Sequence, residues 1–255
     1  MDFAVETRQL TRVFDHFVAV DAIDLQVRPG TFYGFLGPNG AGKSTTIKML
    51  TGLLAPTSGH FRLLGEDVSQ PKIAREVKRR IGVVPENLGL FDNLTAREYL
   101  TFIGRMYLLP RDVMRQRTEE LLQLMDLANE EKKLTMEYSH GMKKKLALAA
   151  ALLPRPELLF LDEPFEGVDA VASRVIKDTL KRYVEHGATV FLTSHIMEIV
   201  ERLCTHVGII VKGKIVHQGS MAEIQASGSL EDRFISVVGT EHRTTAQLGW
   251  LEGAG

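Results

Sequence analysis

The sequence predicts an α/β protein with a mostly parallel sheet, and three patterns support this fold class. Compact apolar runs typical of buried strands occupy four segments, residues 31–36, 157–161, 188–193 and 206–211. Helical patterns separate the last three runs, and alternating strands and helices favour parallel pairing. Residues 1–30 instead predict short strands joined by turns, and residues from about 95 to 153 have helical periodicity. We therefore expect an α/β core with an N-terminal β region and a helical insertion.

The N-terminal half contains several local signals for strands and turns. The segment from Phe17 to Val27 largely alternates apolar and polar residues, and Arg28–Gly30 predicts a turn after it. A helix is expected to begin near Lys43. Residues 57–59 predict a further turn, and a strand is expected at 60–64.

The helical insertion is expected to contain three helices. One apolar face of the first helix is formed by Tyr99, Phe102, Ile103, Met106 and Tyr107. The second helix is marked by Leu121, Leu122 and Met125, and the third by the run from Leu146 to Leu153. Residues after about 225 have no strong periodicity, so no element is predicted there.

Composition and charge narrow the class of protein. The chain has 255 residues, 44% of them hydrophobic, and a net charge of −1, so no positive field favours a nucleic-acid partner. Cys204 is the only cysteine, which excludes an internal disulfide and fits a reducing, cytoplasmic setting. The start, Met1–Glu6, has no signal-peptide pattern. The longest apolar run, Leu146–Leu153, is far shorter than the roughly 20 residues that span a bilayer. We expect any membrane role to depend on a partner.

The segment after the first core strand predicts a phosphate-binding loop. It matches the pattern G-x-x-x-x-G-K-[ST], with a strand before it and a helix after it: Gly37-Pro38-Asn39-Gly40-Ala41-Gly42-Lys43-Ser44. Glycines let the backbone bend round a polyphosphate, and the helix N-terminus adds about half a positive charge. Lys43 would neutralise the β- and γ-phosphates and Ser44 would ligate Mg²⁺. The structural alternative is a glycine-rich turn with a chance lysine. The lack of an Asn-Lys-x-Asp motif favours ATP over GTP.

Two carboxylates follow an apolar strand at Leu158–Leu161. Ligands in α/β proteins bind at the carboxyl ends of such strands. Asp162 is placed to hold Mg²⁺ through its water shell, and Glu163 to orient or deprotonate the water that attacks the γ-phosphate. Alone, this pair has the simpler interpretation of an ordinary strand end.

Four further segments complete a family pattern. The stretch Tyr138-Ser139-His140-Gly141-Met142 lies directly before a helix and is similar to the signature usually written Leu-Ser-Gly-Gly-Gln. Residues 165–169, ending in Asp169, are similar to the D-loop, His195 to the switch histidine, and Phe14 to the aromatic residue that stacks on adenine. The order of these segments resembles that of the ABC (ATP-binding cassette) ATPases over residues 8–220.

The resemblance implies a P-loop NTPase fold with a mostly parallel sheet, an N-terminal antiparallel β subdomain and a helical insertion subdomain. It implies an ATPase domain at residues 1–225, with 226–255 as an unassigned tail. It also implies ATP and Mg²⁺ as cofactors. The helix N-terminus at Ser139 and Gly141 would be a second anion site, which in the family faces the γ-phosphate held by a second copy of the chain.

Each single residue also has a structural interpretation. Ser139 is an ordinary helix N-cap candidate, and a histidine at a strand end such as His195 is commonly a satisfied polar group. Phe14 is an ordinary core residue in many contexts, and Phe17 competes with it for the base. The run Lys143–Lys145 is interpreted as solvated surface charge, with positive potential over a partner's ATP as the sharper alternative.

Two positions depart from the family pattern. Glu86 replaces the usual Q-loop glutamine, where its carboxylate remains able to ligate Mg²⁺, and His140 replaces the first signature glycine. Both variations resemble the exporter-type subset, the ATPases of drug, antibiotic and ion export. The predicted site then comprises the catalytic residues Lys43, Glu163 and His195, the nucleotide contacts Phe14, Gly37, Pro38, Asn39, Gly40, Ala41, Gly42, Lys43, Ser44, Thr45, Ser139, Gly141 and Asp169, and the metal ligands Ser44, Glu86 and Asp162.

The sequence therefore predicts the ATP-binding and ATP-hydrolysing subunit of a membrane transporter, driving export through a separate permease. The expected partners are that permease and a second copy of the chain, without nucleic acid, at the inner face of the membrane. Residues 88–135 would receive the permease, with an apolar groove formed in part by Leu88, Leu90 and Phe91. A soluble ABC ATPase of translation or DNA repair is the main alternative. A non-catalytic nucleotide-binding regulator is another, although Lys43, Asp162 and Glu163 are all present.

Overall fold

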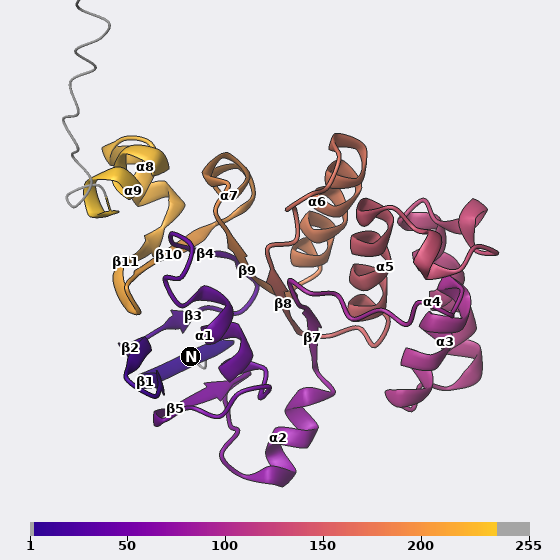
Figure 1. The fold of residues 1–255 in the computed structure, drawn as a ribbon, viewed down its shortest axis with the longest axis horizontal. Coiled ribbons are helices and arrows are strands. Elements are labelled where there is room, and N and C mark those ends of the chain that lie inside the picture. Colours follow the sequence, from indigo (N-terminus) through magenta and orange to yellow (C-terminus); the bar gives the residue numbers. More distant parts are fainter. Residues whose placement is uncertain (1–2, 239–255) are drawn as a thin grey trace, which may run out of the picture.

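The computed structural model describes residues 3–238 and has a six-stranded sheet at its centre (Figure 1). The strand order is β11-β10-β4-β9-β8-β7, and only the edge strand β11 is antiparallel to its neighbour. The bounds are β4 Phe32–Leu36, β7 Ile81–Val84, β8 Leu158–Asp162, β9 Thr189–Ser194, β10 His206–Val211 and β11 Lys214–Ser220. The predicted α/β fold with a mostly parallel sheet is confirmed.

Both faces of this sheet are covered. Side chains alternate between the two faces along each strand, and the apolar ones on each face pack into a separate core. In β4, Tyr33 and Phe35 belong to the core shared with the N-terminal sheet and α1, whereas Phe32 and Leu36 belong to the core shared with the helical region. The ring of Phe191 contacts those of Tyr33, Phe35 and Phe160. One hydrophobic core thus lies on each face of the sheet. The carboxyl-terminal ends of the parallel strands are left free to form the site.

A second, antiparallel sheet is formed by strands that come before and after the phosphate loop in the sequence. Its strands are β1 Val5–Phe14, β2 Phe17–Ile23, β3 Gln26–Val27, β5 Ser58–Leu63 and β6 Glu66–Asp67. The turn predicted at 57–59 is wrong, because β5 already begins at Ser58. Gly59 has a φ of +79°, and a Cβ there would lie 2.2 Å from the carbonyl oxygen of Gln9, beside an irregularity in the β1–β5 register. The glycine therefore marks a close strand contact.

The helices form two groups. Around the sheet lie α1 Lys43–Leu50, α2 Pro71–Lys78, α6 Ala170–Glu185 and α7 Met197–Leu203. The helical insertion contains α3 Ala96–Met106, α4 Arg111–Leu124 and α5 His140–Leu152, with short 3₁₀ helices at Ala128–Glu130 and Thr135–Glu137. Figure 1 shows α3, α4 and α5 gathered with α6 on one side of the molecule, away from the β1–β2–β5 sheet. The three predicted helices of the insertion are confirmed.

The predicted apolar face of the first insertion helix is only partly correct. Thr95 begins α3 with a capping box formed with Glu98. The helix buries Ala96, Tyr99, Leu100 and Gly104, whereas Phe102 and Met106 of the predicted face are exposed. The buried face of α3 therefore includes smaller residues than the predicted face, and the aromatic ring of Phe102 remains exposed.

The chain continues beyond the last core strand into two helices that the sequence pattern did not predict. These are α8 Met221–Ser227 and α9 Leu230–Val238. Ser220 caps α8, and Leu230 is fully buried in the larger core. Residues 239–255 of the predicted tail lie outside the described part of the chain. Among the described residues, no helix has the length and apolarity needed to cross a membrane.

Candidate functional site

The predicted phosphate loop connects β4 to α1 at the carboxyl edge of the sheet. Gly42 has a φ of +109°, and a Cβ there would lie 2.5 Å from the carbonyl oxygen of Ala19. At Gly37, a Cβ would lie 2.3 Å from the carbonyl oxygen of Ile210. Any larger residue at either position would displace backbone, so both glycines are required by the local geometry.

The helix that follows the loop is prepared for an anion. Gly42 is the N-cap of α1 and has no side chain to bond the first backbone N–H groups. Those groups have no acceptor within a helix, and the helix dipole places partial positive charge beside them. A phosphate group can therefore accept hydrogen bonds from the start of α1 without displacing a capping side chain.

Lys43 is buried at the start of α1. Its Nζ donates hydrogen bonds to the carbonyl oxygens of Gly37, over 2.8 Å, and Pro38, over 3.4 Å. It also lies 3.7 Å from Oε1 of Glu163. The ammonium group thus lies between the backbone of the loop and the second carboxylate of the acidic pair, close to where a polyphosphate would enter.

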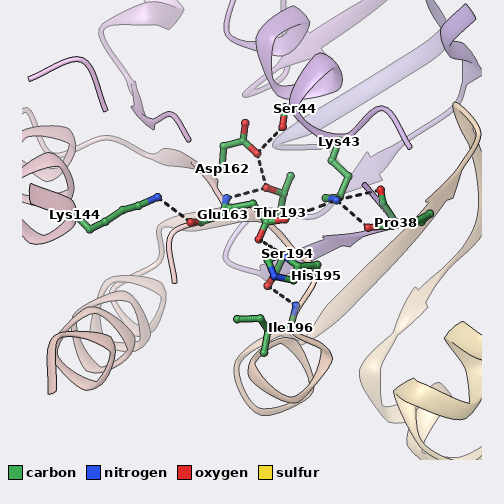
Figure 2. Close-up of polar contacts among 11 residues, drawn as sticks. Pro38, Lys43, Ser44, Lys144, Asp162, Glu163, Thr193, Ser194, His195 and Ile196 are labelled. Carbon is green, nitrogen blue, oxygen red and sulfur yellow. Dashed lines mark hydrogen bonds and ion pairs between the residues drawn. The ribbon is translucent and has the colours of Figure 1, made fainter. Parts of the chain in front are cut away.

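The acidic pair at the end of β8 is held by groups from two neighbouring elements (Figure 2). Ser44 donates a hydrogen bond to Oδ1 of Asp162 over 3.1 Å. Thr193, the residue opposite Asp162 in the β8–β9 register, donates to the same oxygen over 2.6 Å. The predicted Mg²⁺ ligands Ser44 and Asp162 are therefore in direct contact. A hydroxyl and a carboxylate beside a phosphate site are the hard oxygen donors that Mg²⁺ prefers.

Glu163 has the most constrained position in the site. Its backbone has a φ of +48°, an unusual value for a non-glycine residue, and it is buried. Thr193 accepts a hydrogen bond from its N–H over 3.0 Å, and Lys144 donates one to its carbonyl oxygen over 2.9 Å. His195 Nδ1 lies 3.0 Å from its Oε2. Hydrogen bonds thus hold both the backbone and the carboxylate of Glu163 in place.

These groups surround one cavity of about 390 Å³. It is lined by Phe14, Phe17, Ala19, Asn39, Gly40, Ala41, Gly42, Lys43, Ser44, Thr45, Glu86, Glu163, Glu166 and His195. The structure therefore brings most of the predicted loop residues together with Glu86, Glu163 and His195. Phe14 and Phe17 both reach this cavity. The guanidinium of Arg12 covers the Phe14 ring at 4.4 Å, so Phe17 offers the more open ring.

Five predicted nucleotide contacts do not line this cavity: Gly37 and Pro38 of the loop itself, and the more distant Ser139, Gly141 and Asp169. Ser139 is the N-cap of α5 and accepts a hydrogen bond from the N–H of Met142, and Gly141 follows in the same helix. Asp169 caps α6 by accepting hydrogen bonds from Val171 and Ala172. The structure groups Gly141 with Asp169, because a Cβ on Gly141 would lie 3.0 Å from Oδ2 of Asp169. It does not bring these residues to the phosphate loop of the same chain.

The surface interpretation of Lys143–Lys145 is wrong for two of the three lysines. Lys144 and Lys145 are buried, with 3% and 6% of their surface exposed. Burial lowers the pKa of Lys144, and the carboxylates of Glu166, Asp162, Glu86 and Glu163 counteract that shift. Each of the two ammonium groups donates a hydrogen bond to a backbone carbonyl, that of Glu163 for Lys144 and that of Asp126 for Lys145. The burial of these lysines could not be predicted from the charged run itself, because each acceptor lies 19 residues away in the sequence.

Sequence reasoning also missed Thr193 and the contribution of Glu166. Thr193 is in the predicted strand at 188–193, two residues before His195. Its place beside Asp162 follows from parallel pairing of the two predicted strands. The parallel register of the two predicted strands was therefore the signal that pointed to this residue. Glu166 lies in the predicted D-loop, but its place in the cavity depends on the turn that follows Glu163.

Comparisons with known proteins agree with this geometry. A family model described as ABC transporter matches residues 20–166. The chain is 40% identical over 219 residues to the bacitracin transport ATP-binding protein BcrA of Bacillus licheniformis, across 86% of this chain and 70% of that one. It is 37% identical over 224 residues to the Nod factor export ATP-binding protein I of Cupriavidus metallidurans, across 88% and 73%.

A solved structure of an ATP-binding subunit of an ABC transporter has a TM-score of 0.84 to this chain at 27% identity, covering 92% of this chain and 99% of that one. The expected family is thus confirmed by sequence and by fold. The chain belongs to the ABC transporter family, as an ATP-binding subunit that hydrolyses ATP to drive transport.

Proposed function

We propose that two copies of this chain close on two ATP molecules and drive export through a separate membrane permease. The observation that supports this most directly is the position of the signature segment. Ser139 and Gly141 begin a helix, yet they lie outside the cavity formed by their own phosphate loop. A helix N-terminus binds anions, so a second copy is the natural source of the phosphate for this one.

Within one site, the side chains have complementary roles. Glu163 accepts the proton of the attacking water as the water oxygen bonds to the γ-phosphorus and the bond to ADP breaks. Lys43 leaves its contact with Glu163 to neutralise the β- and γ-phosphates, and His195 is placed to bond the γ-phosphate. Ser44 and Asp162 would hold Mg²⁺, with Glu86 as a further carboxylate. When bound, the ion would neutralise charge on the phosphate oxygens.

Export is proposed from the names of similar proteins together with the exposed apolar surface. The relatives above are named for bacitracin transport and for Nod factor export. Phe91 and Phe102 are 50% and 40% exposed, and their rings meet edge to face at 5.2 Å. Leu88 and Leu90, which follow Glu86 within four residues, are partly buried and pack against the larger hydrophobic core. Such an apolar patch fits a permease segment and would hold the chain at the inner face of the membrane.

Complementation between two inactive variants tests the shared site. We expect Ser139→Arg and Glu163→Gln each to be inactive alone, because every site in either homodimer contains one defect. A mixed dimer has one site with Glu163 from the first variant and Ser139 from the second, so it is intact. Roughly a quarter of the activity should return on mixing equal amounts. Ser220→Arg removes a comparable N-cap, that of α8, and is the matched control. Mixtures that stay inactive, or an active Ser139→Arg homodimer, would exclude a shared site.

The permease contact is tested separately. A tagged chain should retain a multispan protein when purified from membranes, and Phe91→Glu should lose it while keeping its basal ATP hydrolysis. Val216 is a similarly exposed apolar residue on β11, so Val216→Glu is the control. Equal retention by Phe91→Glu would place the docking surface elsewhere.

A further inference from the structure

We propose that His140 and Lys144 form a clasp between α5 and the turn at residues 163–166, and that this clasp positions the catalytic Glu163. The two side chains are four residues apart in one helix and therefore lie on the same face. Both contact backbone carbonyls of the same turn. They are positioning residues, because they act through Glu163 and do not line the nucleotide cavity.

Lys144 holds the first carbonyl of the turn. Its Nζ donates to the carbonyl oxygen of Glu163 over 2.9 Å, and both residues are buried. Figure 2 shows Lys144 and Lys43 approaching Glu163 from opposite sides. A buried ammonium group is retained only where it is well satisfied, so this contact defines the position of the backbone carbonyl.

His140 holds the last carbonyl of the turn. Its Nε2 lies 3.2 Å from the carbonyl oxygen of Glu166 and carries the shared hydrogen, since a carbonyl can only accept. Gly167 makes room for the ring, because a Cβ there would lie 3.0 Å from Cδ2 of His140. Gly167 also has a φ of +65°. A glycine at position 140 would have no side chain to make this contact, so the departure from the family signature has a structural role.

The clasp controls the direction of the catalytic carboxylate. The backbone of Glu163 is in the left-handed region, which a non-glycine residue adopts only when its surroundings hold it there. Thr193 holds the N–H of Glu163 and Lys144 holds its carbonyl. If the carbonyl is released, the peptide is free to rotate and the carboxylate leaves the place where water must be oriented. The clasp lies within one subunit, so its role does not depend on whether two copies close as proposed.

Lys144→Met tests the clasp, and Lys145→Met is its matched control. Lys145 is the next residue of α5, is equally buried, and donates to the carbonyl of Asp126, which also has a positive φ of +53°. We expect kcat of Lys144→Met to fall about 10²-fold, as for a misplaced catalytic group, with ATP affinity and KM retained. Lys144→Arg keeps a donor and should recover much of kcat. Lys145→Met should keep kcat.

A second variant keeps the proposal testable if Lys144→Met does not fold. His140 is exposed, so His140→Ala removes one contact with little effect on the core. It should lower kcat more modestly, again with ATP affinity retained. In the double variant the losses should not add, because both residues hold one turn. Equal loss of kcat in Lys144→Met and Lys145→Met, a loss of ATP affinity in step with kcat, or unchanged kcat in both clasp variants would overturn the proposal.

Discussion

The hydroxyl of Thr193 connects the two carboxylate residues of the site: it donates to Oδ1 of Asp162 over 2.6 Å and accepts from the N–H of Glu163 over 3.0 Å. Thr193 is fully buried, and it faces Asp162 across the β8–β9 pair. One side chain therefore contacts both the carboxylate of the proposed metal ligand Asp162 and the backbone of the proposed catalytic residue Glu163. From this relationship we expect Thr193 to influence the chemistry although it does not line the nucleotide cavity.

Thr193→Val should impair catalysis and stability together. The substitution keeps the shape but leaves the N–H of Glu163 without its partner and removes one of the two hydrogen bonds to Oδ1 of Asp162, the other being donated by Ser44. An unsatisfied buried group costs about 1–3 kcal/mol, which urea denaturation would detect. We also expect a lower kcat and a higher Mg²⁺ requirement. Thr193→Ser keeps the hydroxyl and should restore both properties. Normal turnover by Thr193→Val would show that Asp162 and Glu163 are held independently of this hydroxyl.

Glu163→Gln should bind ATP but hydrolyse it about 10²–10⁴-fold more slowly, because the amide cannot accept the proton of water. It should also lose part of its attraction for Lys43, which lies 3.7 Å away. ATP-bound dimers should accumulate on a sizing column. Turnover near that of the unchanged protein would exclude Glu163 as the base, and a monomer at saturating ATP would contradict closure of two copies.

Asp169 should stabilise α6 in a pH-dependent way. The hydrogen bond from the N–H of Ala172 is the main cause that lowers the pKa of this carboxyl below its ordinary 3.8. A lowered pKa means that the stabilisation is present above 3.8 and is lost as the pH falls through the lower, folded-state value. Asp169→Ala should therefore have a lower Tm at neutral pH, and this deficit should shrink in acid.

Asp169→Asn is the control for that prediction, since an asparagine side chain still caps a helix. Its Tm should stay close to that of the unchanged protein at neutral pH. A deficit in Asp169→Ala that stayed the same down to acidic pH would contradict the role of the ionised cap.

Cys204 should report on opening of the core. It is buried beside Gly34, and burial raises the pKa of its thiol well above the ordinary range. Since the thiolate is the reactive form, native protein should react with a thiol reagent only as fast as it opens. ATP should slow the labelling by stabilising the folded state. Immediate stoichiometric labelling of native protein would contradict the burial of this side chain.

The features that the sequence determined by itself are those contained in short continuous segments. The loop that joins a strand to a helix at residues 37–44 and the strand that ends at Asp162 were predicted correctly as local structure, because a few neighbouring residues define a turn, a helix start or a strand end. The alternation of apolar runs likewise sufficed for the parallel sheet. Local geometry and local chemistry agree in these segments, so no distant contact was needed to recognise them.

Tertiary structure alone decided which side chains meet from distant parts of the chain. Lysine is typically a surface residue, yet Lys144 and Lys145 are both buried. Their acceptors, the carbonyls of Glu163 and Asp126, lie within reach only in the folded chain. Leu230 similarly lies in a segment without periodicity, and it is buried because it packs into the larger hydrophobic core. The burial of a charge or of an isolated apolar residue depends on its partners in space, and spacing along the chain does not encode them.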